Sequence, residues 1–98
     1  MGKYLMLWDL NPALVPADPK ERATGWSMLM QMVKQDMQDG ILKDWGSFLA
    51  EGSGYGVMEG TEVEVLKRCQ RYTPFVAFET HPVASVSQVE QMIASLSS

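Results

Sequence analysis

Apolar residues at the start of the chain fall on both sides of an extended backbone. Over residues 3–10, Met6 and Trp8 lie on one side while Leu5 and Leu7 lie on the other. A strand that is apolar on both sides is typical of the middle of a sheet whose two faces are both covered. The pattern therefore predicts a central strand here, and it also predicts that something covers each face of the sheet.

A long amphipathic helix is predicted to follow this strand after a loop marked by Pro12 and Pro16. Asp18 is suited to cap the helix, Pro19 to open its first turn, and Gly40 to end it in a left-handed conformation. Apolar residues between these ends recur at spacings of three and four, which predicts one buried stripe. The stripe consists of Trp26, Leu29, Met30, Val33 and Met37.

A β-hairpin is predicted in the middle of the chain. Residues 41–50 and 55–59 both alternate as extended segments do, and residues 51–54 have the glycine-rich composition of a turn. The glycines in and after this region are interpreted as turn residues, because no phosphate-binding Lys-Ser/Thr pair follows them. They are Gly52, Gly54, Gly56 and Gly60.

The remaining residues predict a helix, a strand and a final helix. Thr61 begins a capping-box spacing, and the helix that it opens is expected to end before Pro74. Residues 75–83 have an extended pattern. A short amphipathic helix is then expected to begin at Ser85 or Ser87, each of which has Gln or Glu three residues later.

The order of these elements is strand, helix, strand, strand, helix, strand and a final helix. This is the split βαβ order of α+β domains with ferredoxin-like topology, a four-stranded antiparallel sheet and, here, an extra C-terminal helix. We expect one domain over residues 1–98, since no linker or internal repeat divides the chain. Two helices cover only one face of such a sheet, so we expect a second copy to cover the other face in a two-fold homodimer.

Composition narrows the possible partners. With 46% apolar and 20% charged residues, the 98-residue chain has the makeup of a packed domain. Its net charge of −4 disfavours nucleic acid as a partner, and no segment approaches the roughly 20 apolar residues of a membrane-spanning helix. Lys67, Arg68 and Arg71 are interpreted as a solvated helix face.

Cys69 is the only cysteine, so the chain can form no internal disulfide. Together with the absence of a secretory signal, this predicts a reducing compartment, and we expect a cytoplasmic location. Cys69 falls on an apolar helical stripe and is expected to be an inert, buried thiol. One His and one Cys make no conventional metal site, so we expect no metal and no cofactor.

Five stretches that span essentially the whole chain carry a resemblance to a known family. They are KYLMLWDL, DPKERATGW, KDWGSF, YGVMEGTEVEV and FETHPVASVSQVE. Through them the chain resembles a family of small, uncharacterised bacterial and archaeal proteins in the dimeric α+β barrel superfamily. Relatives in that group include muconolactone isomerases, YCII-like proteins, cofactor-free antibiotic-biosynthesis monooxygenases and haem-degrading or haem-peroxidase proteins. The resemblance implies a dimeric barrel but no single activity, because these proteins share architecture and differ in chemistry.

His81 and Glu79 are the candidate catalytic residues. They are two positions apart on one predicted strand, so both side chains leave the same face. A carboxylate beside an imidazole can serve in general acid and base catalysis. The alternative is a structural polar contact or a contact at the dimer interface.

Met6, Trp8, Trp45 and Tyr55 are the candidate ligand-binding residues. They come from three predicted strands and are expected to line an apolar pocket between the sheet and its partner copy, where a small apolar or aromatic molecule would fit. The alternative is that they interdigitate with the partner and leave no space. Three functions follow: a homodimer that binds a small molecule, a cofactor-independent isomerase or monooxygenase that uses His81 and Glu79, or a structural or regulatory dimer with a filled interior.

Overall fold

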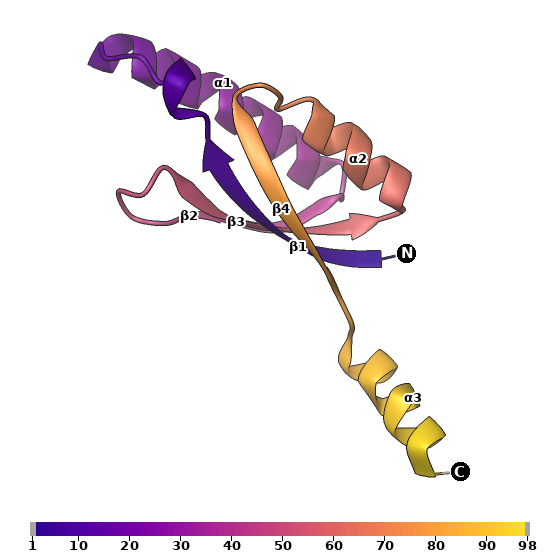
Figure 1. Ribbon diagram of the computed structural model, residues 1–98. Coiled ribbons are helices and arrows are strands. Elements are labelled where there is room, and N and C mark those ends of the chain that lie inside the picture. Colours follow the sequence, from indigo (N-terminus) through magenta and orange to yellow (C-terminus); the bar gives the residue numbers. More distant parts are fainter. Residues whose placement is uncertain (1, 98) are drawn as a thin grey trace.

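Four antiparallel strands form one open sheet in the order β2-β3-β1-β4, and two helices pack on one of its faces (Figure 1). The computed structural model describes residues 2–97. The chain is α+β, and its element order and strand order are consistent with ferredoxin-like topology. The elements are β1 (Gly2–Leu10), η1 (Pro12–Leu14), α1 (Pro19–Gln38), β2 (Leu42–Ser47), β3 (Ser53–Gly60), α2 (Glu62–Gln70), β4 (Val76–Val83) and α3 (Val86–Ser97).

The helices begin where capping side chains predict. Asp18 caps α1 by accepting a backbone hydrogen bond at 3.3 Å. Thr61 and Glu64 form a reciprocal capping box at α2, with hydrogen bonds of 3.2 and 3.1 Å. Ser85 and Gln88 form a second box at α3, at 3.1 and 2.8 Å. Of the two serines that could start the last helix, Ser85 is therefore the cap.

The first strand of the hairpin is shorter than its sequence predicts, and the second, β3, is longer and begins at Ser53 rather than at residue 55. β2 ends at Ser47 rather than at residue 50, and the chain turns over residues 48–52. Ala50 and Gly52 have φ angles of 61° and 63° in this turn, a left-handed conformation that interrupts an extended strand. The side chain of Leu49 is 93% exposed at the tip.

The buried stripe of α1 differs from the predicted one at its C-terminal end. Met37, which was expected in the core, is 42% exposed, whereas Asp36 is completely buried. Asp36 lies three residues after the buried Val33, so the stripe continues through a carboxylate. Gly40 follows with a φ of 78° and ends the helix as predicted.

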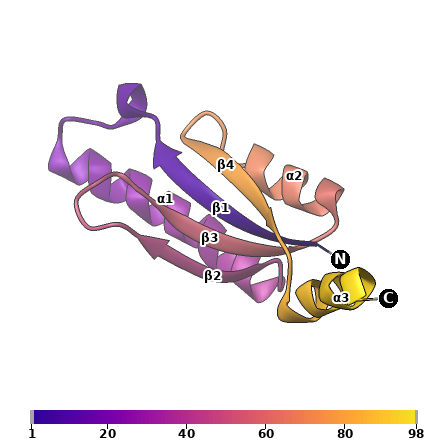
Figure 2. The ribbon, with the colours of Figure 1, turned by 60° about the horizontal axis from the view of Figure 1, so that its bottom comes forward.

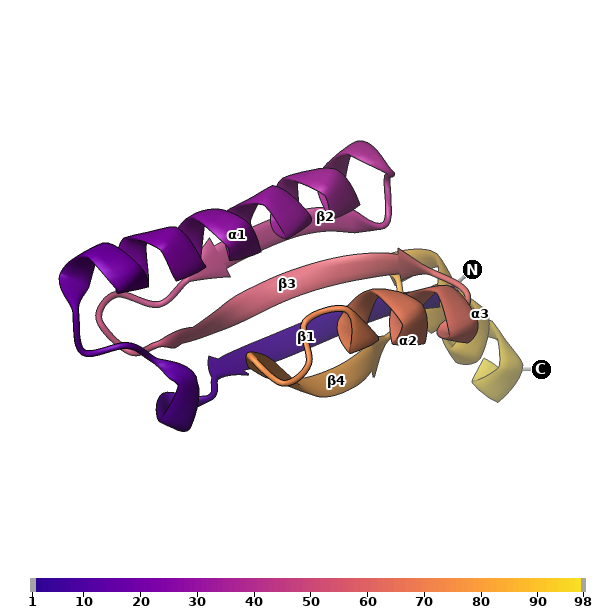
Figure 3. The ribbon, with the colours of Figure 1, turned by 90° about the horizontal axis from the view of Figure 1, so that it is seen from above.

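The two faces of the sheet have different surroundings. Strand alternation and the register place Met6 and Trp8 on the face that α1 and α2 cover, and Leu5 and Leu7 on the opposite face (Figure 3). The core between helices and sheet consists of Met6, Trp8, Val33, Ile41, Leu42, Met58, Val65, Tyr72 and Val76. We call the uncovered side the open face; no helix of the described chain lies over it (Figure 2).

α3 stands apart from the rest of the chain. β4 continues past the sheet and carries α3 out on the side of the open face, away from α1 and α2 (Figure 1). The described chain measures 62 × 25 × 18 Å, and every described residue of α3 is exposed. Among the helices of residues 2–97, none has the length and apolarity needed to cross a lipid bilayer.

Candidate functional site

Three tryptophans gather on the helix-covered face of the sheet. The Trp8 ring stacks on the Trp45 ring with centroids 5.4 Å apart and an interplanar angle of 6°. Trp26 of α1 meets Trp8 edge-on at 6.3 Å. The indole N–H of Trp8 donates to the carbonyls of Gly46 and Tyr55, at 3.2 Å each. Its polar atom is therefore satisfied within the fold.

Gly54 makes this cluster possible. A Cβ at position 54 would lie 2.5 Å from Cζ2 of Trp8 and would also collide with the carbonyl oxygen of Gly46. Gly54 and Gly56 are buried residues within β3 on its helix-covered face, and only Gly52 lies in the turn. The interpretation of these two glycines as turn residues is therefore wrong. Gly54 leaves space for the Trp8 ring, whereas a Cβ at Gly56 would first meet a methyl group of Leu42 at 3.3 Å.

The four predicted ligand-binding residues do not share a face. Met6 and Trp8 are 1% and 3% exposed on the helix-covered face, and Trp45 stacks there with Trp8. Tyr55 pairs with Leu7 in the register and so lies on the open face. The cavity lined by Met6, Trp8 and Trp45 measures about 30 Å³, which is room for a water molecule or two rather than an aromatic ring. The pleat of β1 turns its even-numbered side chains toward the helices, which the sequence pattern left open.

The open face has an apolar centre with a polar border. Leu5 lies opposite Val57, and Leu7 lies opposite Tyr55, so these four side chains form a compact block. All four are only partly buried. Most residues on the same face around them are polar, namely Lys3, Asp9, Asp44, Ser53, Glu59, Glu79 and His81. The apolar exceptions in the register are Ala77 and Val83 of β4. An apolar centre with a polar rim is the usual layout of a protein–protein contact.

Tyr55 is held at the edge of this block by a carboxylate. Its hydroxyl donates to Oδ2 of Asp44 at 2.9 Å. The hydrogen bond to Asp44 raises the pKa of the Tyr55 hydroxyl above its usual value of 10.0. Tyr55 is therefore a neutral donor near pH 7, and its ring stacks on Phe48 with centroids 6.4 Å apart.

His81 and Glu79 both project from the open face, in register with Leu5 and Leu7. Nε2 of His81 lies 3.7 Å from Oε1 of Glu79, which permits an ion pair when the imidazole is protonated but exceeds hydrogen-bond length. Their side chains are 52% and 70% exposed. Neither lines the cavity beneath Trp8 or the groove described below. In a single chain, nothing excludes water from this pair or positions a substrate against it.

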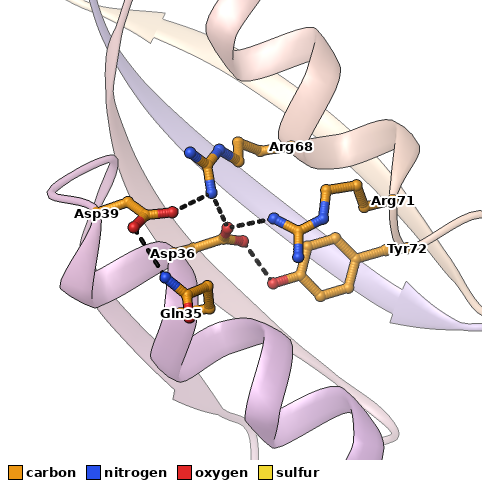
Figure 4. Close-up of polar contacts among 6 residues, drawn as sticks. All are labelled: Gln35, Asp36, Asp39, Arg68, Arg71 and Tyr72. Carbon is orange, nitrogen blue, oxygen red and sulfur yellow. Dashed lines mark hydrogen bonds and ion pairs between the residues drawn. The ribbon is translucent and has the colours of Figure 1, made fainter.

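A buried carboxylate network joins α1 to α2 (Figure 4). Asp36 accepts hydrogen bonds from the hydroxyl of Tyr72 at 2.7 Å, from Arg68 at 2.9 Å and from Arg71 at 3.3 Å. Arg68 also donates to Asp39 at 2.6 Å. Two carboxylates thus face two guanidinium groups, and the local charge is balanced. Lys67 and Arg71 are exposed, as predicted, and Arg68 is partly exposed. What the sequence did not predict is that both arginines compensate a carboxylate that has no contact with water.

The network shifts the pKa values of its members in the directions that its contacts require. The hydrogen bond from Arg68 is the main reason that the pKa of Asp39 lies below its usual value of 3.8. Burial, followed by the hydrogen bond to Asp36, raises the pKa of Tyr72. Burial also raises the pKa of Cys69 to about 11, in agreement with an inert thiol. Because Asp36 is fully buried and accepts hydrogen bonds from Tyr72, Arg68 and Arg71, this network is a structural connection rather than a reactive site.

An apolar groove of about 170 Å³ opens beside the first half of α1. Its walls are the segment around η1, one side of α1, and the loop before β4. Most of its lining is apolar, and Gly25 contributes an open stretch of helix where an added Cβ would meet nothing within 4 Å. The apolar residues nearest the opening include Leu14, Val15, Met28 and Phe75, each between 44% and 60% exposed.

The two arginines of this groove are already engaged. Arg22 donates to the carbonyl oxygens of Pro16 and Ala17 at 3.2 and 2.8 Å, and Arg71 faces Asp36. The charge of Arg71 is thus compensated by a carboxylate, whereas Arg22 is held by two neutral backbone carbonyls. Most of the remaining lining is apolar, so the groove selects mainly by shape and apolarity. Sequence reasoning missed this site because its walls come from three separate segments. A glycine in the middle of a long amphipathic helix was the available signal.

Within residues 2–97, no three His, Cys, Asp or Glu side chains are arranged to hold a metal ion. No protein-family model matches the chain, and no curated protein sequence is significantly similar to it. The open face and the groove are therefore the two surfaces of the described chain from which a function can be inferred.

Proposed function

We propose that this protein binds a small, uncharged, largely apolar or aromatic molecule in the groove beside α1. The observation that carries this proposal is an apolar space of about 170 Å³ left open by Gly25. A dry cavity of roughly 150 Å³ is enough to admit a benzene ring. The proposal keeps the class of ligand expected from the sequence but moves it from the open face to a groove within one chain.

The residues of the groove suit such a ligand. Trp26 and Phe75 offer ring surfaces, while Met28 and Met32 are flexible and polarisable side chains that adapt to varied apolar shapes. Because Arg22 and Arg71 are engaged by carbonyl and carboxylate oxygens, and the chain has a net charge of −4, an anionic ligand gains little here. We therefore favour a neutral ligand of one or two rings.

Methyl NMR of the methionines tests this proposal, with indole and naphthalene as the probes. Either probe is expected to shift the methyl signals of Met28 and Met32, which line the groove, and to leave that of the core residue Met58 unchanged. Gly25→Leu fills the groove and is expected to weaken binding about tenfold or more. Ser27→Leu places the same side chain on an exposed position of the same helix and serves as the control.

Two results would overturn the proposal. The first is the absence of methionine shifts at probe concentrations near saturation. The second is unchanged binding by Gly25→Leu when that variant keeps the wild-type circular dichroism spectrum. Binding lost equally in Gly25→Leu and Ser27→Leu would also count against it, because a filled groove would not be the cause.

We further propose that two copies pair through their open faces, as in the dimeric α+β barrel superfamily that the sequence resembles. What supports this is the block of Leu5, Leu7, Tyr55 and Val57, which has no cover within the described chain. Two sheets that pack face to face lie about 10 Å apart, close enough for these side chains to interdigitate. A pair related by two-fold symmetry would bring each block against its equivalent.

Sedimentation equilibrium tests the pairing. Leu7→Glu places a charge at the centre of the proposed contact and is expected to convert the dimer to monomer. Leu49→Glu makes the same change at a 93% exposed loop tip and is expected to leave the dimer intact. A wild-type monomer at tens of micromolar, or a Leu7→Glu dimer of unchanged affinity, would refute the pairing.

The enzyme alternative gains no support from the exposed pair of His81 and Glu79.

A further inference from the structure

Within residues 2–97, no residue of α3 is buried against the rest of the chain. α3 has 12 residues, about 18 Å of helix. Isolated helices of this length are marginal in water even when their sequences favour helix. α3 also contains Val, Ser and Ile, which have only moderate helix propensity. Its capping box at Ser85 orders one end, but a stable α3 needs a surface against its apolar side.

The apolar side of α3 has the spacing of a helix that packs against protein. Its residues recur at intervals of three, four and three, and each is 41% to 79% exposed. They are Val86, Val89, Ile93 and Leu96, which we call the α3 stripe. Helices that lie on membranes usually carry Lys or Arg on their polar side, and α3 has neither. A protein surface is therefore the occupant that its chemistry favours.

A matching surface lies between α2 and β4. An open groove of about 670 Å³ there is lined by apolar atoms of Val65, Leu66, Cys69, Phe78 and Pro82. Leu66 is 68% exposed, although it lies on a helix that otherwise covers the core. We call this the α2–β4 groove. The groove also has polar lining residues, Glu62, Gln70, Thr73 and Thr80, but most of its lining is apolar. Neither the groove nor the α3 stripe has a cover in the described chain.

The direction of α3 indicates which copy it meets. The α2–β4 groove lies on the helix-covered side of the sheet, whereas α3 leaves β4 on the open side (Figures 1 and 2). A partner sheet packed on the open face would begin about 10 Å away, less than the length of α3. α3 would thus extend past the edge of the partner sheet to the level of the partner's helices.

We propose that α3 is an exchanged arm, in which the α3 stripe of each chain packs into the α2–β4 groove of a second copy. This inference rests on the proposed pairing of open faces and adds a second contact to it. Two-fold symmetry gives two equivalent arm contacts and closes the assembly at two chains. Both otherwise uncovered apolar surfaces are then buried.

The single cysteine of the chain offers a direct test, because Cys69 lines the α2–β4 groove. Ile93→Cys places a second thiol on the α3 stripe, and Gln91→Cys places one on the opposite side of α3 as the matched control. After oxidation with copper–phenanthroline, Ile93→Cys is expected to give a disulfide-linked dimer in which peptide mapping joins Cys69 to position 93. Gln91→Cys and the wild type are expected to remain mostly reduced.

The possible results of this experiment distinguish failure of the exchanged arm from failure of the pairing of open faces. A link within one chain would overturn the exchange and assign α3 to its own groove. No link, in a protein that still sediments as a dimer and whose Cys69 is shown to react with iodoacetamide, would overturn the arm while the pairing of open faces stands. A wild-type monomer would overturn both.

A second pair of variants tests the contact between α3 and the α2–β4 groove without introducing a cysteine. Ile93→Asp is expected to raise the dimer dissociation constant about tenfold or more, and Gln91→Asp to leave it within about twofold. The two variants add the same charge to the same helix, so they differ only in the side of α3 that carries it. Equal dissociation constants for the two would also overturn the exchanged arm.

Discussion

Alanine in place of glycine is expected to have opposite effects at positions 25 and 54. Both glycines lie within regular elements, Gly25 in α1 and Gly54 in β3. An added Cβ at position 25 meets nothing within 4 Å, whereas at position 54 it meets two carbons of Trp8 at 2.5 and 2.6 Å. The chemical change is the same, so the difference in free energy of unfolding reports the surroundings.

The magnitudes follow from these distances. Alanine is favoured over glycine in a helix interior by about 0.8–1.0 kcal/mol, so Gly25→Ala is expected to stabilise by about 0.5–1 kcal/mol. At position 54 the Trp8 ring would have to move by about 1 Å to restore ordinary contact, and overpacking of a filled core costs about 1–3 kcal/mol. Because Trp8 is stacked and hydrogen-bonded, and the Gly46 carbonyl is backbone, Gly54→Ala is expected to cost about 3 kcal/mol.

Urea unfolding followed by far-ultraviolet circular dichroism measures both changes. The protein concentration must be held fixed across variants, because association contributes to apparent stability. In a Trp8→Leu background, the cost of Gly54→Ala should fall without vanishing, since the Gly46 carbonyl remains. A Gly54→Ala variant within about 0.5 kcal/mol of wild type would refute the placement of Trp8 against β3. A destabilised Gly25→Ala variant would show that the groove is not open.

Three further predictions concern the network and the cysteine. Asp36→Asn is expected to destabilise the fold by about 3 kcal/mol because it removes the negative charge that Arg68 and Arg71 face. Tyr72→Phe is expected to cost about 2 kcal/mol because it removes the hydrogen bond to Asp36. Urea unfolding measures both changes, and losses below about 1 kcal/mol would contradict the network's structural role. The pKa of Asp39 is lowered in the folded state, so its contact with Arg68 stabilises fully above about pH 5 and is lost as pH falls through the lowered value. The stability difference between wild type and Asp39→Asn should then shrink toward zero in acid, and a difference constant from neutral pH down would count against it. With a pKa of about 11, Cys69 is expected to react with iodoacetamide at pH 8 about tenfold more slowly than an unstructured cysteine. Its thiolate fraction is about a hundredfold lower, while the intrinsic nucleophilicity of its thiolate is about tenfold higher. An equal rate would show that the thiolate of Cys69 is accessible and contradict the prediction.

Local signals in the sequence located most elements because those signals act over a few residues. The capping box at Thr61, the stop at Gly40 and the extended pattern of residues 3–10 all reappear in the structure. Caps and turns depend on hydrogen bonds to backbone groups two to four residues away, so they can be predicted from the sequence alone. The exception was the hairpin, where Ala50 has a left-handed backbone conformation that an alanine does not predict.

The residues of the candidate site were harder to predict from the sequence than the helices and strands were. Strand alternation correctly separated Trp8 from Leu7, but it could not say which of the two faces α1 and α2 would cover. As a result, Met6 and Trp8 were assigned to a partner-facing pocket and are in fact core residues. Placement of His81 and Glu79 on one face required only the period of a strand and was correct, while their distance of 3.7 Å required the fold.

By itself, the sequence determined the order of strands and helices, the caps at Asp18 and Thr61, and the presence of apolar side chains on both faces of β1, since each depends on patterns that repeat or close within two to four residues. Only the tertiary structure decided which face the helices cover, that Asp36 lies buried opposite Arg68 and Tyr72, and that Gly25 opens a groove. These features arise from contacts between residues more than 30 positions apart, as between Asp36 and Arg68. Residue patterns within one element cannot specify such contacts, because packing between elements selects one face and one register from several that local periodicity allows.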